Sequence, residues 1–168
     1  MNAALEFVFR SILIGAGATL VIDAWAALLK RFGVPSLNLA MLGRWVGHLP
    51  QGRFIHAGIA KSAPVRGESW LGWLAHYGIG AGFAGVLLAV FGLDWARSPT
   101  FGPAFTIGIA TLPAPLFVLQ PALGAGIASS KTPRPVFNTL KSLTTHVMFG
   151  LGLFLAARAC ALLFPTFE

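Results

Sequence analysis

Residues 70–93 of the chain are WLGWLAHYGIGAGFAGVLLAVFGL, and His76 is the one side chain among them that titrates near neutral pH. A run of about 20 apolar residues is long enough to cross a bilayer as a helix. A helix is the expected form because lipid offers no hydrogen bonds to the backbone. This stretch therefore predicts a transmembrane helix.

Three more apolar stretches occur, at about residues 11–29, 103–128 and 139–164. The 168 residues are 56% hydrophobic and only 10% charged, with a mean hydropathy of +0.76. Soluble domains carry about 25% charged residues, so an ordinary soluble enzyme, a disordered chain and a coiled coil are excluded. We expect an all-α polytopic membrane protein in which residues 1–168 form a single domain of four transmembrane helices.

The basic residues are unevenly divided between the two sides of these spans. Nine lie in or beside the first and third connections, and three lie on the other side: Lys30, Arg31, Arg44, Arg53, Lys61, Arg66, Lys131, Arg134 and Lys141 against Arg10, Arg97 and Arg158. Cytoplasmic connections are enriched in Lys and Arg. The distribution predicts an inner-membrane protein with both termini outside. It also accounts for most of the net charge of +7, so anionic lipid, and not nucleic acid, is the expected partner of the basic residues.

The first connection is long and contains a pattern typical of a cytoplasmic amphipathic helix. Ser36 is the expected N-cap, and apolar residues follow at three- and four-residue spacing: Leu37, Met41, Leu42, Trp45, Val46 and Leu49. Pro50 to Gly52 should end this helix, and a second short helix is expected over residues 54–61.

The third span carries Pro113, Pro115 and Pro121. Each proline lacks an amide donor and disturbs the helical hydrogen bond to the residue four positions earlier. We therefore expect a broken helix. Either it is a simple kink or its freed backbone groups line a ligand site.

One polar side chain lies about six to eight residues inside the cytoplasmic end of each span: Asp23, His76, Gln120 and His146. At 1.5 Å per residue, all four are expected roughly 10 Å below the same face. Ionisable groups within a membrane are costly and often functional. These four residues are the predicted ligand- or proton-binding site, which could relay protons, bind a cation or orient imidazole for a metal. The alternative is a structural hydrogen-bond network that fixes helix register.

The histidines also raise the question of a cofactor. Two or three imidazoles with a carboxylate suit zinc or non-haem iron, and His76 with His146 could ligate a metal or a haem between two spans. Arg44, His48, His56 and Glu68 are additional candidates for the site. For His48 and His56, an interfacial or loop position is the simpler interpretation.

Glycines mark one face of the second span. Gly78, Gly82 and Gly85 form a smooth stripe that suits a homodimer or another membrane protein. Residues 80–85 also match the pattern G-x-G-x-x-G, but no strand precedes them, so a dinucleotide site is excluded.

Several short strings occur together in the chain: Gly43-Arg44-Trp45, Gly47-His48-Leu49, Gly67-Glu68, Gly72-Trp73, His76-Tyr77, Gln120-Pro121-Ala122, Gly124-Ala125-Gly126, Ser130-Lys131-Thr132-Pro133, His146 and Phe149-Gly150. As a set they resemble the bacterial "domain of unknown function 2938" family of small four-span membrane proteins. The resemblance extends over nearly the whole chain and implies the same topology. It implies no reaction, ligand or catalytic residue.

Three functions remain open at this point. The first is a bundle that binds or translocates a small ligand, cation or proton through the polar layer. The second is a membrane-embedded metal or haem enzyme that uses His76 and His146. The third is a structural or accessory subunit that docks through its glycine face.

Overall fold

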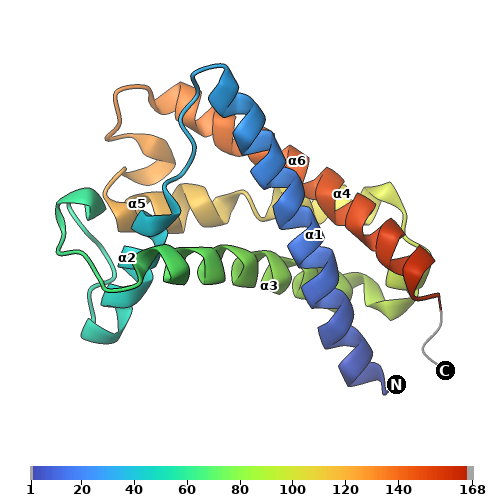
Figure 1. Cartoon of the computed structure of the whole chain (residues 1–168). Coiled ribbons are helices and arrows are strands. Elements are labelled where there is room, and N and C mark those ends of the chain that lie inside the picture. Colours follow the sequence, from blue (N-terminus) through green and yellow to red (C-terminus); the bar gives the residue numbers. More distant parts are fainter. Residues whose placement is uncertain (1, 166–168) are drawn as a thin grey trace. The chain divides into compact units, whose positions relative to one another are not determined.

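The computed structural model describes residues 2–165, and within them it contains helices and connecting loops (Figure 1). The α-helices are α1 (Ala3–Arg31), α2 (Leu39–His48), α3 (Glu68–Arg97), α4 (Phe101–Ala110), α5 (Gln120–Leu123) and α6 (Pro135–Leu163). The 3-10 helices are η1 (Leu49–Gln51), η2 (Ile59–Lys61) and η4 (Ile127–Ser129), and η3 (Ala114–Leu119) is a π-helix.

Four helical segments are long and apolar enough to cross a membrane: Ala3–Arg31, Glu68–Arg97, Phe101–Leu123 and Pro135–Leu163. The prediction of an all-α polytopic membrane protein with four spans is confirmed. The chain divides into two compact units. Unit 1 comprises Met1–Val34, Tyr77–Thr111 and Thr145–Glu168, and unit 2 comprises Pro35–His76 and Leu112–Thr144.

Small residues bring the helices of unit 1 together. Gly15 of α1 lies against the backbone of Ala81 in α3, and Gly108 of α4 lies against the backbone of Gly150 in α6. A methyl group at any of these glycines would overlap or crowd the facing backbone. Because lipid supplies no hydrophobic force between helices, such close packing is a main source of association.

A buried ionic cluster, absent from our predictions, lies in unit 1. Arg10 is fully buried and Glu6 is 2% exposed. The Arg10 Nε donates to Glu6 Oε1 at 2.9 Å, and its Nη2 donates to the backbone oxygen of Phe164 at 3.0 Å. Arg97 completes the cluster, with its Nη2 2.7 Å from Glu6 Oε2. The spacing of Glu6 and Arg10, four residues apart, was the sequence signal for the pair.

The end of the second span differs from the prediction. Gly92 interrupts α3 with φ 80° and ψ 168°, a conformation open essentially to glycine alone. Helical structure then resumes as far as Arg97, so the helix extends past the predicted end of the span at residue 93 and the connection begins at Ser98. The ion pairs of Arg97 with Glu6 and Asp94 help to hold this last turn.

In unit 2, the amphipathic helix forms as α2, but its cap is Asn38 and not Ser36. The Asn38 side chain accepts a hydrogen bond from the amide of Ala40 at 3.0 Å. Gly43 of α2 and Gly72 of α3 let the two backbones meet, because a methyl group on either would overlap a facing backbone oxygen. Figure 1 shows α2 against the start of α3. The predicted ending after Pro50 is confirmed by Gly52, whose φ is 73°.

The expected helix over residues 54–61 was wrong. Only Ile59–Lys61 is helical, and residues 53–58, which we call the strap, run without helical structure. Tertiary hydrogen bonds oppose a helix here. The His56 amide donates to the Ala122 carbonyl at 2.9 Å, and Trp45 Nε1 donates to the Phe54 carbonyl at 2.9 Å.

The third span is broken, as its prolines predicted. The α-helix α4 ends at Ala110, and the π-helix η3 and the short α5 follow. The amide of Gln120 bonds to the carbonyl of Pro115, five residues earlier. Gly124, with φ 92°, ends α5 before the predicted end of the span at residue 128. Removal of amide donors by proline explains why a regular α-helix cannot continue.

Candidate functional site

Asp23 and Tyr77 meet in unit 1. The Tyr77 hydroxyl donates to Asp23 Oδ2 at 3.0 Å, and both residues are half-buried. One turn away, Thr19 of α1 packs directly on Gly80 of α3. The missing side chain of Gly80 thus lets α3 approach α1 closely enough for the tyrosine to reach the carboxylate.

His146 is held by α4 in the same unit. Its Nδ1 lies 3.0 Å from the Gly108 carbonyl oxygen and 3.1 Å from Thr111 Oγ1. A carbonyl oxygen only accepts, so Nδ1 carries the proton and Nε2 is the basic nitrogen. A metal or a proton would therefore bind at Nε2.

The packing of α1 on α6 sets the relative levels of these groups. Gly17 faces Ala156, while Gly152 faces Ala18 and Val21, so the two helices run antiparallel. Continuing this register toward the end of α1 brings Asp23 and His146 within about one helical turn of the same level. Two of the four predicted site residues therefore lie in unit 1 at levels that differ by about one helical turn at most.

Gln120, in unit 2, organises a loop. Its Oε1 accepts from Ser129 Oγ at 3.0 Å, and its Nε2 donates to Ser142 Oγ at 3.1 Å. Ser129 and the preceding Ala128 both have positive φ, at 62° and 47°. Such backbone is strained for residues other than glycine and persists only where surrounding contacts impose it. Gln120 supplies one of those contacts, through Ser129.

His76 also belongs to unit 2, where its ring packs edge-on against Trp73 with centroids 6.3 Å apart. The predicted layer thus divides between units, with Asp23 and His146 in one and His76 and Gln120 in the other. None of the four is fully buried. A single layer built from all four stays a prediction.

Arg44 and Glu68 form a two-pronged ion pair. Arg44 Nε and Nη2 lie 2.8 Å from the two carboxylate oxygens of Glu68. The Arg44 Nη1 also donates to the Ser62 carbonyl at 3.0 Å. The hydrogen bond to Glu68 raises the pKa of the Arg44 guanidinium. This pair joins α2 to the start of α3 and to the end of η2.

His48 and His56 form a buried pair. Their exposed fractions are 3% and 6%, their rings stack with centroids 5.1 Å apart, and His48 Nδ1 lies 2.9 Å from His56 Nε2. Burial, and then the nearby charge of Arg53, lower the pKa of His48. His56 lies in the strap, which is a loop position as interpreted, whereas His48 ends α2; the burial of both rings was not predicted. The tight turn at Gly52 brings the two residues together. Their spacing in the sequence matches no known motif, so the pair was not predicted.

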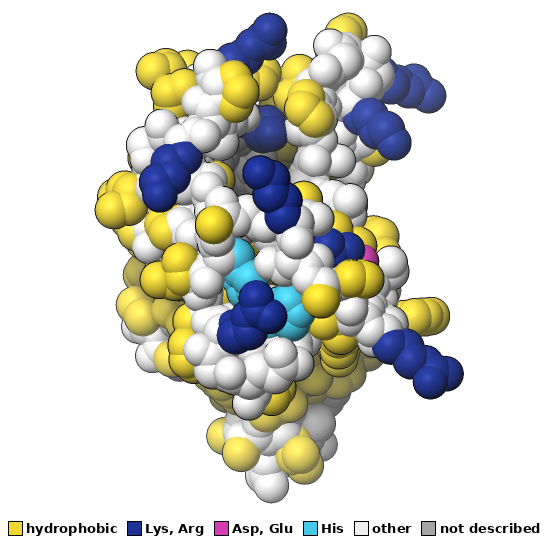
Figure 2. Space-filling view, turned by 90° about the vertical axis from the view of Figure 1, so that its left-hand side faces the viewer, with side chains coloured by type: hydrophobic (Ala, Val, Ile, Leu, Met, Phe, Trp, Pro, Cys, Tyr) yellow, Lys and Arg dark blue, Asp and Glu magenta, His cyan; other side chains and the backbone are white. Residues whose placement is uncertain are grey.

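Histidine side chains are visible among Lys and Arg side chains on the face drawn in Figure 2. Within residues 2–165, no three His, Cys, Asp or Glu side chains gather closely enough to hold a metal ion. The described residues therefore offer no third protein ligand for a metal or haem at His76 and His146. That hypothesis stays a prediction.

The glycine stripe of α3 is only partly open. A methyl group at Gly78 or Gly82 would meet nothing within 4 Å, whereas one at Gly85 would lie 3.6 Å from Ser11 Oγ. A side chain at Gly85 would therefore be in ordinary contact with α1. Gly78 and Gly82, four residues apart, remain as a smooth helix face.

Comparison with known proteins gives one match, to a family model. No curated protein and no solved structure matches the chain. A family model described as "Protein of unknown function (DUF2938)" matches residues 12–160, which take in the second and third spans, most of the first and last, the strap and the histidine pair. The chain therefore belongs to the DUF2938 family.

Proposed function

We propose that this multi-pass protein lies in the inner membrane with both termini outside, and that it binds and conducts a proton or a small cation at the level of Asp23 and His146. The observation that carries the proposal is the α1–α6 register, which brings a carboxylate and an imidazole within about one helical turn of the same level among apolar helices. Ionisable residues in such positions are expensive to keep and commonly mark ion or proton pathways.

The chemistry of the two groups is complementary. Asp23 accepts a hydrogen bond from Tyr77, which orients the carboxylate. His146 presents Nε2 as a base because Nδ1 is engaged by the Gly108 carbonyl. A carboxylate and a neutral imidazole can each accept a proton and release it, and together they can coordinate a cation.

The experiment is proton flux into vesicles that contain the purified protein and a trapped pH-sensitive dye, with an imposed potassium diffusion potential. We expect flux in the wild type and its loss in Asp23→Asn and in His146→Gln. Asp94→Asn is the matched control, because the Asp94 side chain is 95% exposed, and it should conduct normally. Flux of sodium, potassium and magnesium down imposed gradients is then measured in the same vesicles to test for cation conduction.

Size-exclusion chromatography in mild detergent must show that each variant is as monodisperse as the wild type. Unchanged flux in both folded variants removes the proposal. His76→Ala and Gln120→Leu extend the test to the unit 2 residues of the predicted layer. Loss of flux in these variants as well supports a pathway that uses all four side chains.

A second candidate function rests on the smooth face at Gly78 and Gly82, where the helix surface is open. Close approach of another transmembrane helix suits such a face. It favours an accessory subunit that docks a membrane partner or a second copy of the chain. A stable solitary monomer in mild detergent counts against the second copy.

A further inference from the structure

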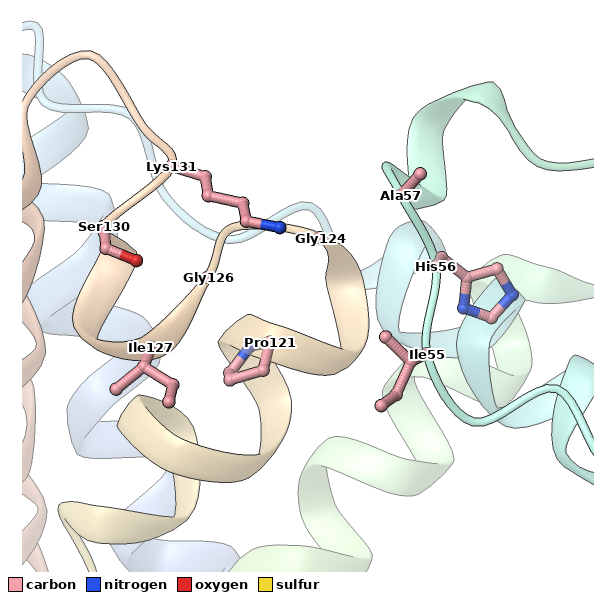
Figure 3. A pocket seen from close by; sticks show the side chains of 9 residues that line it. All are labelled: Ile55, His56, Ala57, Pro121, Gly124, Gly126, Ile127, Ser130 and Lys131. Atoms are coloured by element: carbon pink, nitrogen blue, oxygen red, sulfur yellow. The ribbon is translucent and has the colours of Figure 1, made fainter.

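The strap borders two hollows in unit 2, and they differ in polarity. One, of about 440 Å³, lies between the strap and the loop after α5, where Pro121, Ile127 and Lys131 line it (Figure 3). The other, of about 350 Å³, is lined by the strap and the segment that follows it, with Arg53, Lys61 and Ser62 as its polar members. We call this second hollow the basic hollow.

The charge around the basic hollow is strongly positive. Unit 2 contains a single acidic residue, Glu68, against seven basic ones: Arg44, Arg53, Lys61, Arg66, Lys131, Arg134 and Lys141. Glu68 is bound by Arg44. Two cations and a hydroxyl that line one concave site are the groups that proteins use for phosphate oxygens.

His56 adds an observation that points to a missing ligand. It borders the basic hollow and is 6% exposed, and its Nδ1 is buried without a hydrogen-bond partner among the described residues. Figure 3 shows its ring on the opposite side of the strap from Lys131. Buried polar nitrogens are nearly always paired, so this one calls for a partner from outside the described residues.

The hydrogen bond between the two rings allows two arrangements of the protons. In one, His56 Nε2 donates to His48 Nδ1, and His56 Nδ1 is a bare lone pair that can bind an anion only after it takes up a proton. In the other, His48 Nδ1 donates and His56 Nδ1 already carries a proton.

We propose that the basic hollow binds a phosphate group, held by Arg53, Lys61 and Ser62, and that His56 Nδ1 takes up a proton as the phosphate enters and donates a hydrogen bond to it. The phosphate oxygens thereby satisfy the buried nitrogen. A lipid headgroup and a soluble phosphate ester carry the same chemistry.

Other charged groups also act on His56 and must be considered in any pH dependence. They are His48 and Arg44 of α2, Arg53 of the strap, Lys61 of η2, Lys131 of the neighbouring loop and Glu68 at the start of α3. Of these, Arg44, Arg53, Lys61 and Lys131 are cations. A bound anion offsets them, so binding and proton uptake favour each other.

The test is calorimetric titration of the full chain, delipidated in a neutral detergent, with inorganic phosphate at pH 6 and pH 8. We expect binding at least about tenfold tighter at pH 6. Titrations in two buffers of different ionisation enthalpy should reveal proton uptake. Arg53→Gln and Lys61→Gln should each weaken binding at least about tenfold, the effect of losing one charge-assisted hydrogen bond.

Arg66→Gln is the matched control, since Arg66 is an exposed basic residue of unit 2 that lines neither hollow, and its affinity should equal that of the wild type. In His56→Gln, the pH dependence and the proton uptake should disappear while weaker binding remains. Two short-chain lipids distinguish the sources of the phosphate group. If phosphatidic acid binds much more tightly than inorganic phosphate and phosphatidylcholine does not, the ligand is a lipid headgroup. If phosphatidic acid and inorganic phosphate bind with equal affinity, the ligand is a soluble ester.

Three results overturn the proposal. One is the absence of phosphate binding at millimolar concentration at both pH values. Another is a loss of affinity in Arg66→Gln as large as that in Arg53→Gln, because binding would then reflect diffuse charge. The last is undiminished proton uptake in His56→Gln. None of these variants changes Asp23 or His146, so the outcome is independent of the proposed conduction.

Discussion

Glu6 and Arg10 lie one helical turn apart on α1 and are joined by an ion pair of 2.9 Å that is almost completely removed from solvent. Glu6→Gln leaves the buried guanidinium without its counter-charge. We expect a loss of about 3–5 kcal/mol in stability, read as a lower thermal unfolding temperature in detergent.

The exposed partner of the same network is the control for that variant. Asp94→Asn removes a carboxylate that pairs with Arg97 at the surface, and such pairs contribute little. Its unfolding temperature should match the wild type. If the unfolding temperature fell equally in both variants, the buried ion pair of Glu6 would contribute no more to stability than the exposed pair of Asp94.

Two glycines of α3 differ in what faces them. A side chain at Gly80 would overlap Thr19 Oγ1, whereas one at Gly82 would meet nothing within 4 Å. Gly80→Val should therefore destabilise the protein by about 1–3 kcal/mol, and Gly82→Val should leave the unfolding temperature unchanged. Equal sensitivity would show that a partner covers Gly82.

The histidine pair predicts acid sensitivity. The folded-state pKa of His48 is lowered below its ordinary value of 6.5, so the unfolded chain binds the proton more strongly. Stability should be constant above about pH 6.5 and should fall as pH drops from there toward the folded-state pKa. Thermal unfolding between pH 8 and pH 5 measures this, and His48→Gln should remove the part of the slope due to His48.

The loop after α5 predicts a stabilising substitution. Ala128 has a φ of 47°, which glycine adopts without steric cost. Ala128→Gly should slow proteolysis of residues 124–132, whereas Gln120→Leu, which loses the bonds to Ser129 and Ser142, should accelerate it. Faster cleavage of Ala128→Gly would refute the interpretation of the loop as strained.

Membrane orientation is tested by labelling. Cys160 is the one cysteine in the sequence and is buried, so Cys160→Ala gives a background without reactive thiols. Lys61→Cys and Ser98→Cys then place single exposed thiols on opposite sides. In intact cells, an impermeant maleimide should label only Ser98→Cys. Labelling of Lys61→Cys alone reverses the assigned orientation.

The sequence predicted the features of the fold that depend on local chemistry. Apolar runs of sufficient length gave the four spans, and the missing amides of Pro113 and Pro115 gave the broken one. The strap was mispredicted because its helical pattern is overridden by the bond between His56 and Ala122, which connects residues far apart in the chain.

The candidate site was less accessible to sequence reasoning. Asp23 and His146 were found because polar groups stand out in apolar spans. The pairing of His48 with His56 depends on the turn at Gly52 and on burial by surrounding segments, neither of which has a motif. The acceptor role of the Phe164 carbonyl for Arg10 involves only a backbone atom, which leaves no trace in the sequence.

That contact between Arg10 and Phe164 also sets an order of events during biosynthesis. The first helix leaves the ribosome long before α6 has been made, so its guanidinium enters the bilayer ahead of an acceptor that directly follows α6. This contact can therefore form only after the whole of α6 has been synthesised, and until then Arg10 lacks one of its native hydrogen bonds.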